Sequence, residues 1–129
     1  PEIAGRIEKH VEPFPIFGAD DMRSFCYIDD AVEAIQKVME SKATDGGTYH
    51  IGTKEEIVIS ELVQNIFELM AWKPKSLDIK NSPEGSVKRR LADVSKIKKD
   101  TGWEAKTSLK EGLRKTIDWY LKNPKPVGK

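Results

Sequence analysis

Short apolar runs alternate along this chain with segments in which apolar residues recur every three or four positions. The first pattern is typical of short strands and the second of amphipathic helices. The expected strands cover residues 24–28, 48–52, 57–59 and 76–79. The expected helices cover about 30–40, 60–73, 93–100 and 109–122, with a shorter helix within 3–11. The sequence therefore predicts an α/β fold (α+β as an isolated lobe), with a small sheet of short strands and about four helices around it.

Polar residues stand where the helices are expected to begin. Asp29 and Asp30 precede the apolar positions of the helix over 30–40. Two adjacent carboxylates are a candidate acid–base pair, but an aspartate at a helix start commonly accepts backbone N–H groups and complements the helix dipole. We therefore interpret both as capping residues. Caps are also expected for the later helices, at Ser60, at Asp93 and at Ser108, the last in an S-x-x-E capping box with Glu111.

Composition narrows the class of protein. The chain has 129 residues, which fits one domain, and its 22 Lys plus Arg against 21 Asp plus Glu give a net charge of +1. This balance argues against a nucleic-acid partner, although half of residues 88–99 are basic. The single cysteine, Cys26, excludes an internal disulfide and a cysteine-based zinc cluster. No apolar run approaches the ~20 residues of a membrane span, and no signal peptide opens the chain, so we expect a cytoplasmic protein with no membrane partner.

Several common catalytic and cofactor motifs are missing from the sequence. No G-x-G-x-x-G follows an expected strand, and Gly46-Gly47 precedes one, where it cannot place a pyrophosphate on a helix N-terminus. There is no Tyr-x-x-x-Lys, nucleophile elbow, Walker loop or histidine-rich metal spacing. We therefore predict no catalytic, cofactor-binding or metal-binding residue in this chain. If the chain serves an enzyme, the cofactor and the catalytic base lie elsewhere.

Three blocks of sequence, in order, resemble one family. The first is I-F-G-A-D-D-M-R-S-F-C-Y-I-D-D-A-V-E-A-I, from residue 16. The second is Y-H-I-G-T at 49–53, followed by I-S-E-L at 59–62. The third comprises R-R-L-A-D-V-S-K at 89–96, T-G-W at 101–103 and L-K-E-G-L at 109–113. Together they resemble the C-terminal part of the extended short-chain dehydrogenase/reductases, the nucleotide-sugar epimerases and dehydratases.

The resemblance implies a role for the chain. In that family an N-terminal Rossmann domain holds NAD or NADP, and the C-terminal lobe closes over a nucleoside diphosphate-sugar. Residues 1–129 would then be a single substrate-binding lobe, a fragment of an NAD-dependent epimerase or dehydratase without its Rossmann domain. We expect such a lobe to bind the nucleoside diphosphate-sugar, to bind no NAD alone and to be inactive in isolation. Because it would expose the surface that faces its missing domain, it is also expected to form a homodimer, to aggregate, or to be locally disordered near residues 1–15.

Arginines are the first candidates for substrate binding. Arg23 stands at a strand start beside a glycine turn, where a guanidinium can make paired contacts to a diphosphate. The matching family arginine contacts substrate phosphates, and the alternative is a surface arginine paired with a nearby aspartate: Asp20, Asp21 or Asp29. The resemblance also assigns Arg90 or its neighbour Arg89 to the site. The alternative there is a solvated basic turn with Lys88.

Phe25 is the remaining candidate, because the aromatic rings of Phe25 and Tyr27 could stack on a base or sugar. Aromatic residues at alternating strand positions, here Phe25 and Tyr27, are more often part of a core. Two positions depart from the family pattern: His50 replaces a common asparagine, and the turn over 18–22 is one residue shorter.

Two other functions stay open from sequence alone. The chain could be a stand-alone, non-catalytic module that binds a nucleotide-sugar or an acidic partner. Nucleic-acid binding through residues 88–99 is the weaker alternative. The nucleotide, the sugar, the choice of NAD or NADP, and the choice among epimerase, dehydratase and decarboxylase are not set by these residues.

Overall fold

The computed structural model of the chain describes residues 2–123; the end of the tail, over 124–129, lies outside the described residues. The helices are α1 (Glu2–Glu8), α2 (Ile28–Glu40), α3 (Ile59–Leu69), α4 (Ser95–Thr101) and α5 (Leu109–Lys122), with a 3-10 turn η1 (Lys42–Thr44). The strands are β1 (Phe14–Phe17), β2 (Met22–Ser24), β3 (Glu56–Val58), β4 (Leu77–Lys80) and β5 (Arg89–Arg90). The predicted α/β class, with short strands among helices, is confirmed.

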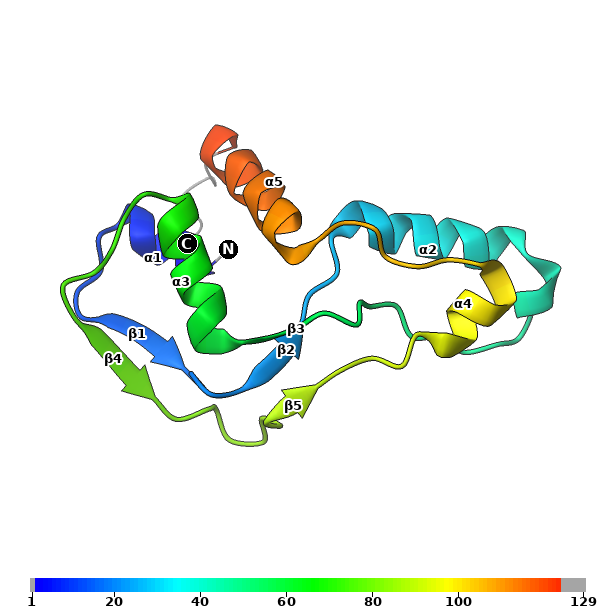
Figure 1. Cartoon of the computed structure of the whole chain (residues 1–129), viewed down its shortest axis with the longest axis horizontal. Coiled ribbons are helices and arrows are strands. Elements are labelled where there is room, and N and C mark those ends of the chain that lie inside the picture. The colour runs from blue at the N-terminus through cyan, green and yellow to red at the C-terminus, as the bar shows by residue number, and fades with distance from the viewer. Residues whose placement is uncertain (1, 124–129) are drawn as a thin grey trace, which may run out of the picture.

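The short strands form two small sheets. In one, β1 and β4 run parallel, with Phe14 opposite Leu77. In the other, β2 lies in the centre, antiparallel to β3 and parallel to β5. Figure 1 shows β2, β3 and β5 in the middle of the molecule, between the helices α1, α3 and α5 on one side and α2 and α4 on the other. The central sheet therefore joins the two halves of the chain.

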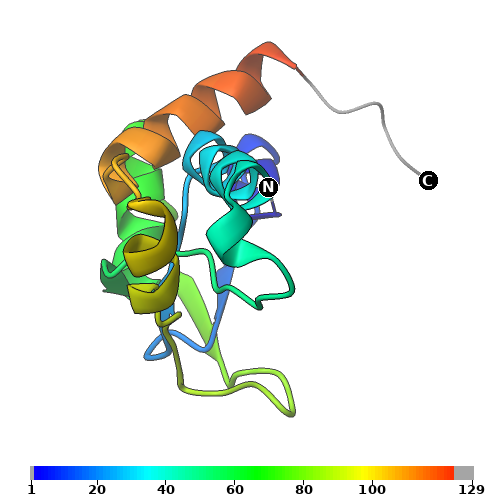
Figure 2. The same cartoon turned by 90° about the vertical axis from the view of Figure 1, so that its right-hand side faces the viewer.

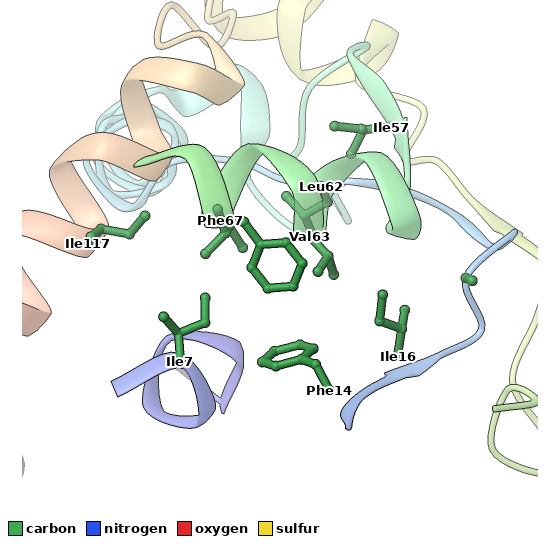
Figure 3. Close-up of a cluster of buried hydrophobic side chains, with 10 residues drawn as sticks. Ile7, Phe14, Ile16, Ile57, Leu62, Val63, Phe67 and Ile117 are labelled. Carbon is green, nitrogen blue, oxygen red and sulfur yellow. The ribbon is translucent and has the colours of Figure 1, made fainter. Parts of the chain in front are cut away.

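The larger hydrophobic cluster lies in the half that holds α1, α3 and α5. Phe14 of β1 and Phe67 of α3 are buried at its centre, with ring centroids 5.0 Å apart in an edge-to-face arrangement. Figure 3 shows Ile7 and Ile117 closing this cluster from α1 and α5. Edge-to-face aromatic pairs add about 0.5–1.5 kcal/mol beyond the area that they bury. The cluster therefore fixes the helices against the β1–β4 sheet.

A second, smaller cluster lies between α2 and α4. Its buried members are Ala34, Val94, Ile97 and Trp103, and Ile51 and Tyr49 pack against them. The sequence predicts a strand over 48–52, but the structure has none there. A strand needs a neighbouring backbone to complete its hydrogen bonds. Side chains hold this segment in place: the Tyr49 hydroxyl donates to Asp100 Oδ2 at 2.8 Å, and the Lys96 ammonium donates to the Thr48 carbonyl oxygen at 3.0 Å. That prediction was wrong because no ladder partner lies beside the segment within residues 2–123.

The predicted strand over 24–28 is shorter in the structure and begins earlier. β2 ends at Ser24, because only residues 22–24 face β3, and α2 begins already at Ile28. Phe25, Cys26 and Tyr27 form an extended link between the two elements.

Local capping predictions succeed at some helices and fail at others. The Ser108 hydroxyl accepts the Glu111 N–H at the start of α5, as predicted. Asp93 accepts the Ser95 N–H at 2.9 Å, but the N-cap of α4 is Val94, so Asp93 precedes the cap position that the sequence predicts for it. The capping roles of Asp29 and Asp30 were wrong: both lie inside the first turn of α2, whose N-cap is Tyr27 with no side-chain cap hydrogen bond. The Asp30 carboxylate is buried and accepts the backbone N–H of Thr107 at 2.9 Å. Ser60 lies inside α3, whose N-cap is Val58, so its capping role was also wrong. For Asp30, a tertiary hydrogen bond replaces the local one that the sequence predicts.

Within residues 2–123 there is no helix of the length and apolar character needed to cross a bilayer. The segment over 81–88, which links β4 to β5, runs along the lower edge of the molecule in Figures 1 and 2, away from the helices.

Candidate functional site

The central sheet brings the two principal candidate arginines together. In the parallel β2–β5 ladder, Arg23 lies opposite Arg90 and Met22 lies opposite Arg89. Successive side chains of a strand point to opposite faces, and directly paired residues share a face. Arg23 and Arg90 therefore lie on one face of the sheet, and Arg89 lies on the other.

The guanidinium of Arg23 is held by a dense set of hydrogen bonds. Its Nη1 donates to the carbonyl oxygens of Met22 at 2.8 Å and Lys88 at 3.2 Å. Its Nη2 donates to Asp21 Oδ2 at 2.9 Å and to Ser86 Oγ at 3.0 Å. Of the three aspartates considered from sequence, the ion pair is with Asp21. Because Ser86 and Lys88 belong to the β4–β5 connection, Arg23 fastens that connection to β2.

The carboxylate of Asp21 is itself buried in this network. Asp21 is 7% exposed, and its Oδ2 also accepts the Ser82 hydroxyl at 2.8 Å. Ser82 and Ser86 lie 61 and 63 positions along the chain from their partners. Sequence reasoning missed both serines, and no local pattern could have found them, because the contacts depend on how β4 and β5 return to β2.

Arg89 and Arg90 differ in their surroundings. Arg89 makes a two-pronged ion pair with Glu56, with Nε–Oε1 and Nη2–Oε2 distances of 2.8 and 2.7 Å. These hydrogen bonds and the opposite charge hold the pKa of Glu56 below its usual value and raise that of Arg89. Arg90 is exposed, and its side chain has no hydrogen bond or ion pair with the rest of residues 2–123. The charge of Arg89 is compensated, whereas that of Arg90 is not.

Phe25, which is close to Arg23 in sequence, lines an apolar cleft. Phe25 is 40% exposed, so it is not the core residue that its strand position favours. The cleft encloses about 400 Å³ and is walled by α1, α3, α5 and the 25–28 link. Tyr27, also at this cleft, packs against Gly112 of α5 and lies under the Lys115 ammonium, 5.2 Å from its ring centroid. Phe25 therefore presents an accessible aromatic surface two residues after Arg23.

Metal and redox-active side chains are sparse in this region. No three His, Cys, Asp or Glu side chains among residues 2–123 are grouped so as to hold a metal ion. Cys26 packs against the α2–α4 cluster, and burial, with the nearby Asp30 charge, raises the pKa of its thiol. A thiol with a raised pKa is a poor nucleophile. Among the described residues, this region presents guanidinium N–H groups, which can donate paired hydrogen bonds to an anion.

Known proteins match this chain over most of its length. The sequence profile of the family described as GDP-mannose 4,6 dehydratase matches residues 1–116. An Arabidopsis thaliana protein, the trifunctional UDP-glucose 4,6-dehydratase/UDP-4-keto-6-deoxy-D-glucose 3,5-epimerase/UDP-4-keto-L-rhamnose-reductase, is 35% identical over 116 residues, which are 88% of this chain and 17% of that protein.

Solved structures also resemble this chain over most of its length. A UDP-glucose 4-epimerase of Thermotoga maritima, solved with UDP-glucose, has a TM-score of 0.85 and 29% identity over 96% of this chain and 39% of its own. A dTDP-glucose 4,6-dehydratase of Bacillus anthracis, solved with NAD, has a TM-score of 0.83 and 27% identity over 95% of this chain and 39% of its own. The chain spans about a third or less of the length of the curated relatives that it matches.

Proposed function

The chain belongs to the GDP-mannose 4,6-dehydratase family of nucleotide-sugar-modifying enzymes, and from that membership we propose that it is the substrate-binding C-terminal lobe of a nucleotide-sugar dehydratase or epimerase. The observation that carries the proposal is the register of the β2–β5 ladder, which sets Arg23 and Arg90 side by side on one face. Two arginines on one face of a sheet can supply paired N–H donors to the oxygens of a diphosphate.

The two arginines differ in what they contribute. Arg90 has an uncompensated charge at the surface, so it supplies the attraction for the diphosphate. Arg23 is neutralised by Asp21 and holds the β4–β5 connection in place beside Arg90. Phe25, which follows the end of β2 and is exposed, is the proposed contact for the base or sugar. Fixing the diphosphate in this way would orient the sugar for reaction.

The described residues do not fit a dinucleotide cofactor. A dinucleotide cradle needs a glycine-rich turn that runs from a strand directly into a helix N-terminus. Among residues 2–123, Gly18 lies between two strands, and Gly46 and Gly85 lie in turns that precede no helix. We therefore propose that NAD or NADP is held by a separate dinucleotide-binding domain of the complete enzyme, and we assign no chemical step to it in this chain.

An exposed apolar face of α2 is the second argument for such a partner domain. On α2, Ile28, Val32, Ile35 and Met39 recur at helical spacing and are between 44% and 80% exposed, whereas Ala34 on the opposite side is buried against α4. We call these four residues the α2 stripe. A continuous exposed apolar stripe marks a surface that another protein surface covers. The unpaired extended segment over 48–52 lies in the same half of the molecule and offers backbone groups to a further strand.

Titration of the chain with inorganic pyrophosphate tests the arginine site, because this probe does not depend on the identity of the nucleotide. We expect Arg90→Ala to weaken binding by about ten-fold or more, since a hydrogen bond to a charged group is worth roughly 1.5–3 kcal/mol. Arg89→Ala is the matched control: it removes the same charge from the same strand, but from a guanidinium already held by Glu56. Calorimetry measures both.

The outcome separates this function from the alternatives. Equal losses in the two variants would indicate a diffuse basic surface, as in nucleic-acid binding, and no loss in either would mean that the site lies elsewhere. Under this proposal, catalysis requires the partner domain that holds NAD or NADP. The isolated chain is therefore expected to give no NAD reduction with a nucleotide-sugar.

A further inference from the structure

The Asp21 carboxylate accepts a hydrogen bond from Arg23 Nη2 at 2.9 Å, a donor that an anionic ligand could otherwise use. A guanidinium has five N–H donors, and the contacts of Arg23 to Met22, Lys88, Asp21 and Ser86 engage both of its Nη atoms. Only Nε has no such contact among the described residues. A diphosphate beside this group therefore meets a neutral ion pair with few free donors.

The surrounding structure is shaped around the Asp21 carboxylate. Gly18 has a φ of +61°, and a Cβ there would lie 2.6 Å from Asp21 Oδ2 and 2.7 Å from Ser82 Oγ. A side chain at position 18 would thus force the Asp21 carboxylate to move. The Ser82 hydroxyl and the Arg23 guanidinium hold the same oxygen, at 2.8 and 2.9 Å. The Asp21 carboxylate is thus hydrogen-bonded by Ser82 and Arg23 and lies close to the backbone of Gly18.

The hydrogen bonds of Asp21 and Arg23 also hold the β4–β5 connection. Ser82, Ser86 and Lys88 all belong to the β4–β5 connection, and each bonds to the Asp21–Arg23 pair. The free Arg90 follows this connection directly, in β5. Opening of the Asp21–Arg23 pair would therefore weaken the contacts that hold this connection, which leads into β5 and Arg90.

We propose that Asp21 is an internal competitor for the anion site on Arg23: a diphosphate contacts Arg90 first and gains Arg23 only by displacing the Asp21 carboxylate. The inference rests on the proposed function, because it concerns the same diphosphate site. It makes Asp21 an affinity-determining residue that touches neither base nor sugar. Its removal is then expected to increase affinity, which loss of a purely structural residue would not do.

The test is pyrophosphate titration of the full chain with Asp21→Asn, which keeps the size of the side chain and removes its charge. We expect binding roughly three- to ten-fold tighter than in the wild type, since an ion pair that must open before the ligand gains Arg23 lowers the apparent affinity by about that factor. Asp20→Asn is the matched control, because it removes the same charge one residue earlier from an exposed side chain. It is expected to change affinity by less than about two-fold, because exposed charges are screened.

The outcomes separate the two proposals. If Arg90→Ala weakens binding but Asp21→Asn leaves it unchanged or weaker, this inference is wrong and the proposed function stands. If neither the wild type nor Asp21→Asn binds pyrophosphate, both fail. Equal gains for Asp20→Asn and Asp21→Asn would also overturn the inference, since they would report net charge alone.

A measurement on the wild type covers the case in which Asp21→Asn does not fold. The Asp21 carboxylate ¹³C signal and the Arg23 side-chain ¹⁵N signals are followed by NMR during the same titration. We expect them to shift together as pyrophosphate saturates the site. An Asp21 signal that stays unchanged at saturation would show that the pair remains closed, and would overturn the proposal.

Discussion

Arg89 and Arg90 are adjacent in sequence yet have opposite chemical states in the fold. The pleat of β5 turns one side chain toward Glu56 and the other toward the face that holds Arg23. A run of like charges therefore does not act as one patch. At the scale of the residue, the available charge is decided by the partners that the sheet supplies.

The Glu56–Arg89 pair predicts a pH dependence of stability. The pKa of Glu56 is lowered from 4.5, chiefly by the hydrogen bonds from Arg89. A depressed pKa contributes stability that is fully present above the unfolded value and is lost as pH falls through the lower folded value. Glu56→Gln should therefore unfold at lower temperature than the wild type above about pH 4.5, with the difference shrinking below it.

Thermal unfolding across this pH range, followed by circular dichroism, measures the effect. Glu84→Gln, in the exposed β4–β5 connection, is the control and should show no such convergence. A constant gap between wild type and Glu56→Gln at all pH values would count against the assigned pair.

At the scale of the element, Asp30 joins two helices that are distant in sequence. Its buried carboxylate accepts the N–H of Thr107, in the segment that enters α5, 77 positions away. Asp29, its neighbour, is exposed on the first turn of α2. The contact therefore ties the start of α2 to the start of α5.

Asp30→Ala is expected to lower the free energy of unfolding by about 1–3 kcal/mol, because it leaves the Thr107 N–H without its acceptor. Asp29→Ala removes the same charge from the same helix turn and should cost about 1 kcal/mol or less, through the helix dipole alone. Urea unfolding measures both. Equal costs would mean that the dipole interaction, rather than the buried hydrogen bond, is the main contribution of Asp30.

At the scale of the whole molecule, the two hydrophobic clusters are unequal, and the smaller half carries the α2 stripe. That half buries Ala34, Val94, Ile97 and Trp103 but leaves a continuous apolar face of α2 open. Burial of such a face lowers free energy by about 25 cal/mol per Å². The isolated chain is thus expected to associate with itself or with a partner domain through α2.

Ile35→Glu places a charge in the middle of the α2 stripe and should reduce self-association without lowering stability, because the residue is already exposed. Gln36→Glu adds the same charge one position away, outside the stripe, and is the control. Sedimentation velocity over a range of concentrations measures the effect. Equal behaviour of the two variants, or a wild type that stays monomeric throughout, would argue against α2 as the contact surface.

The sequence by itself determined the features that depend on neighbours along the chain. The period of the apolar residues predicted the helices, and Ser108 predicted the cap of α5. The three motif blocks pointed to the extended short-chain dehydrogenase/reductases, and the family match bears this out. These signals are local because capping, turn and helix energies act within a few residues.

Only the tertiary structure decided which residues form the candidate site. Arg23 and Arg90 were each identified from sequence, but their shared face follows from the β2–β5 register. Asp21, Ser82 and Ser86 came together through chain segments about 60 positions apart, as did Asp30 and Thr107 over a longer separation. The predicted strand over 48–52 found no ladder partner. Hydrogen bonds and ion pairs are short-ranged, so which groups pair is set by how the segments return to one another in space, and that no local pattern records.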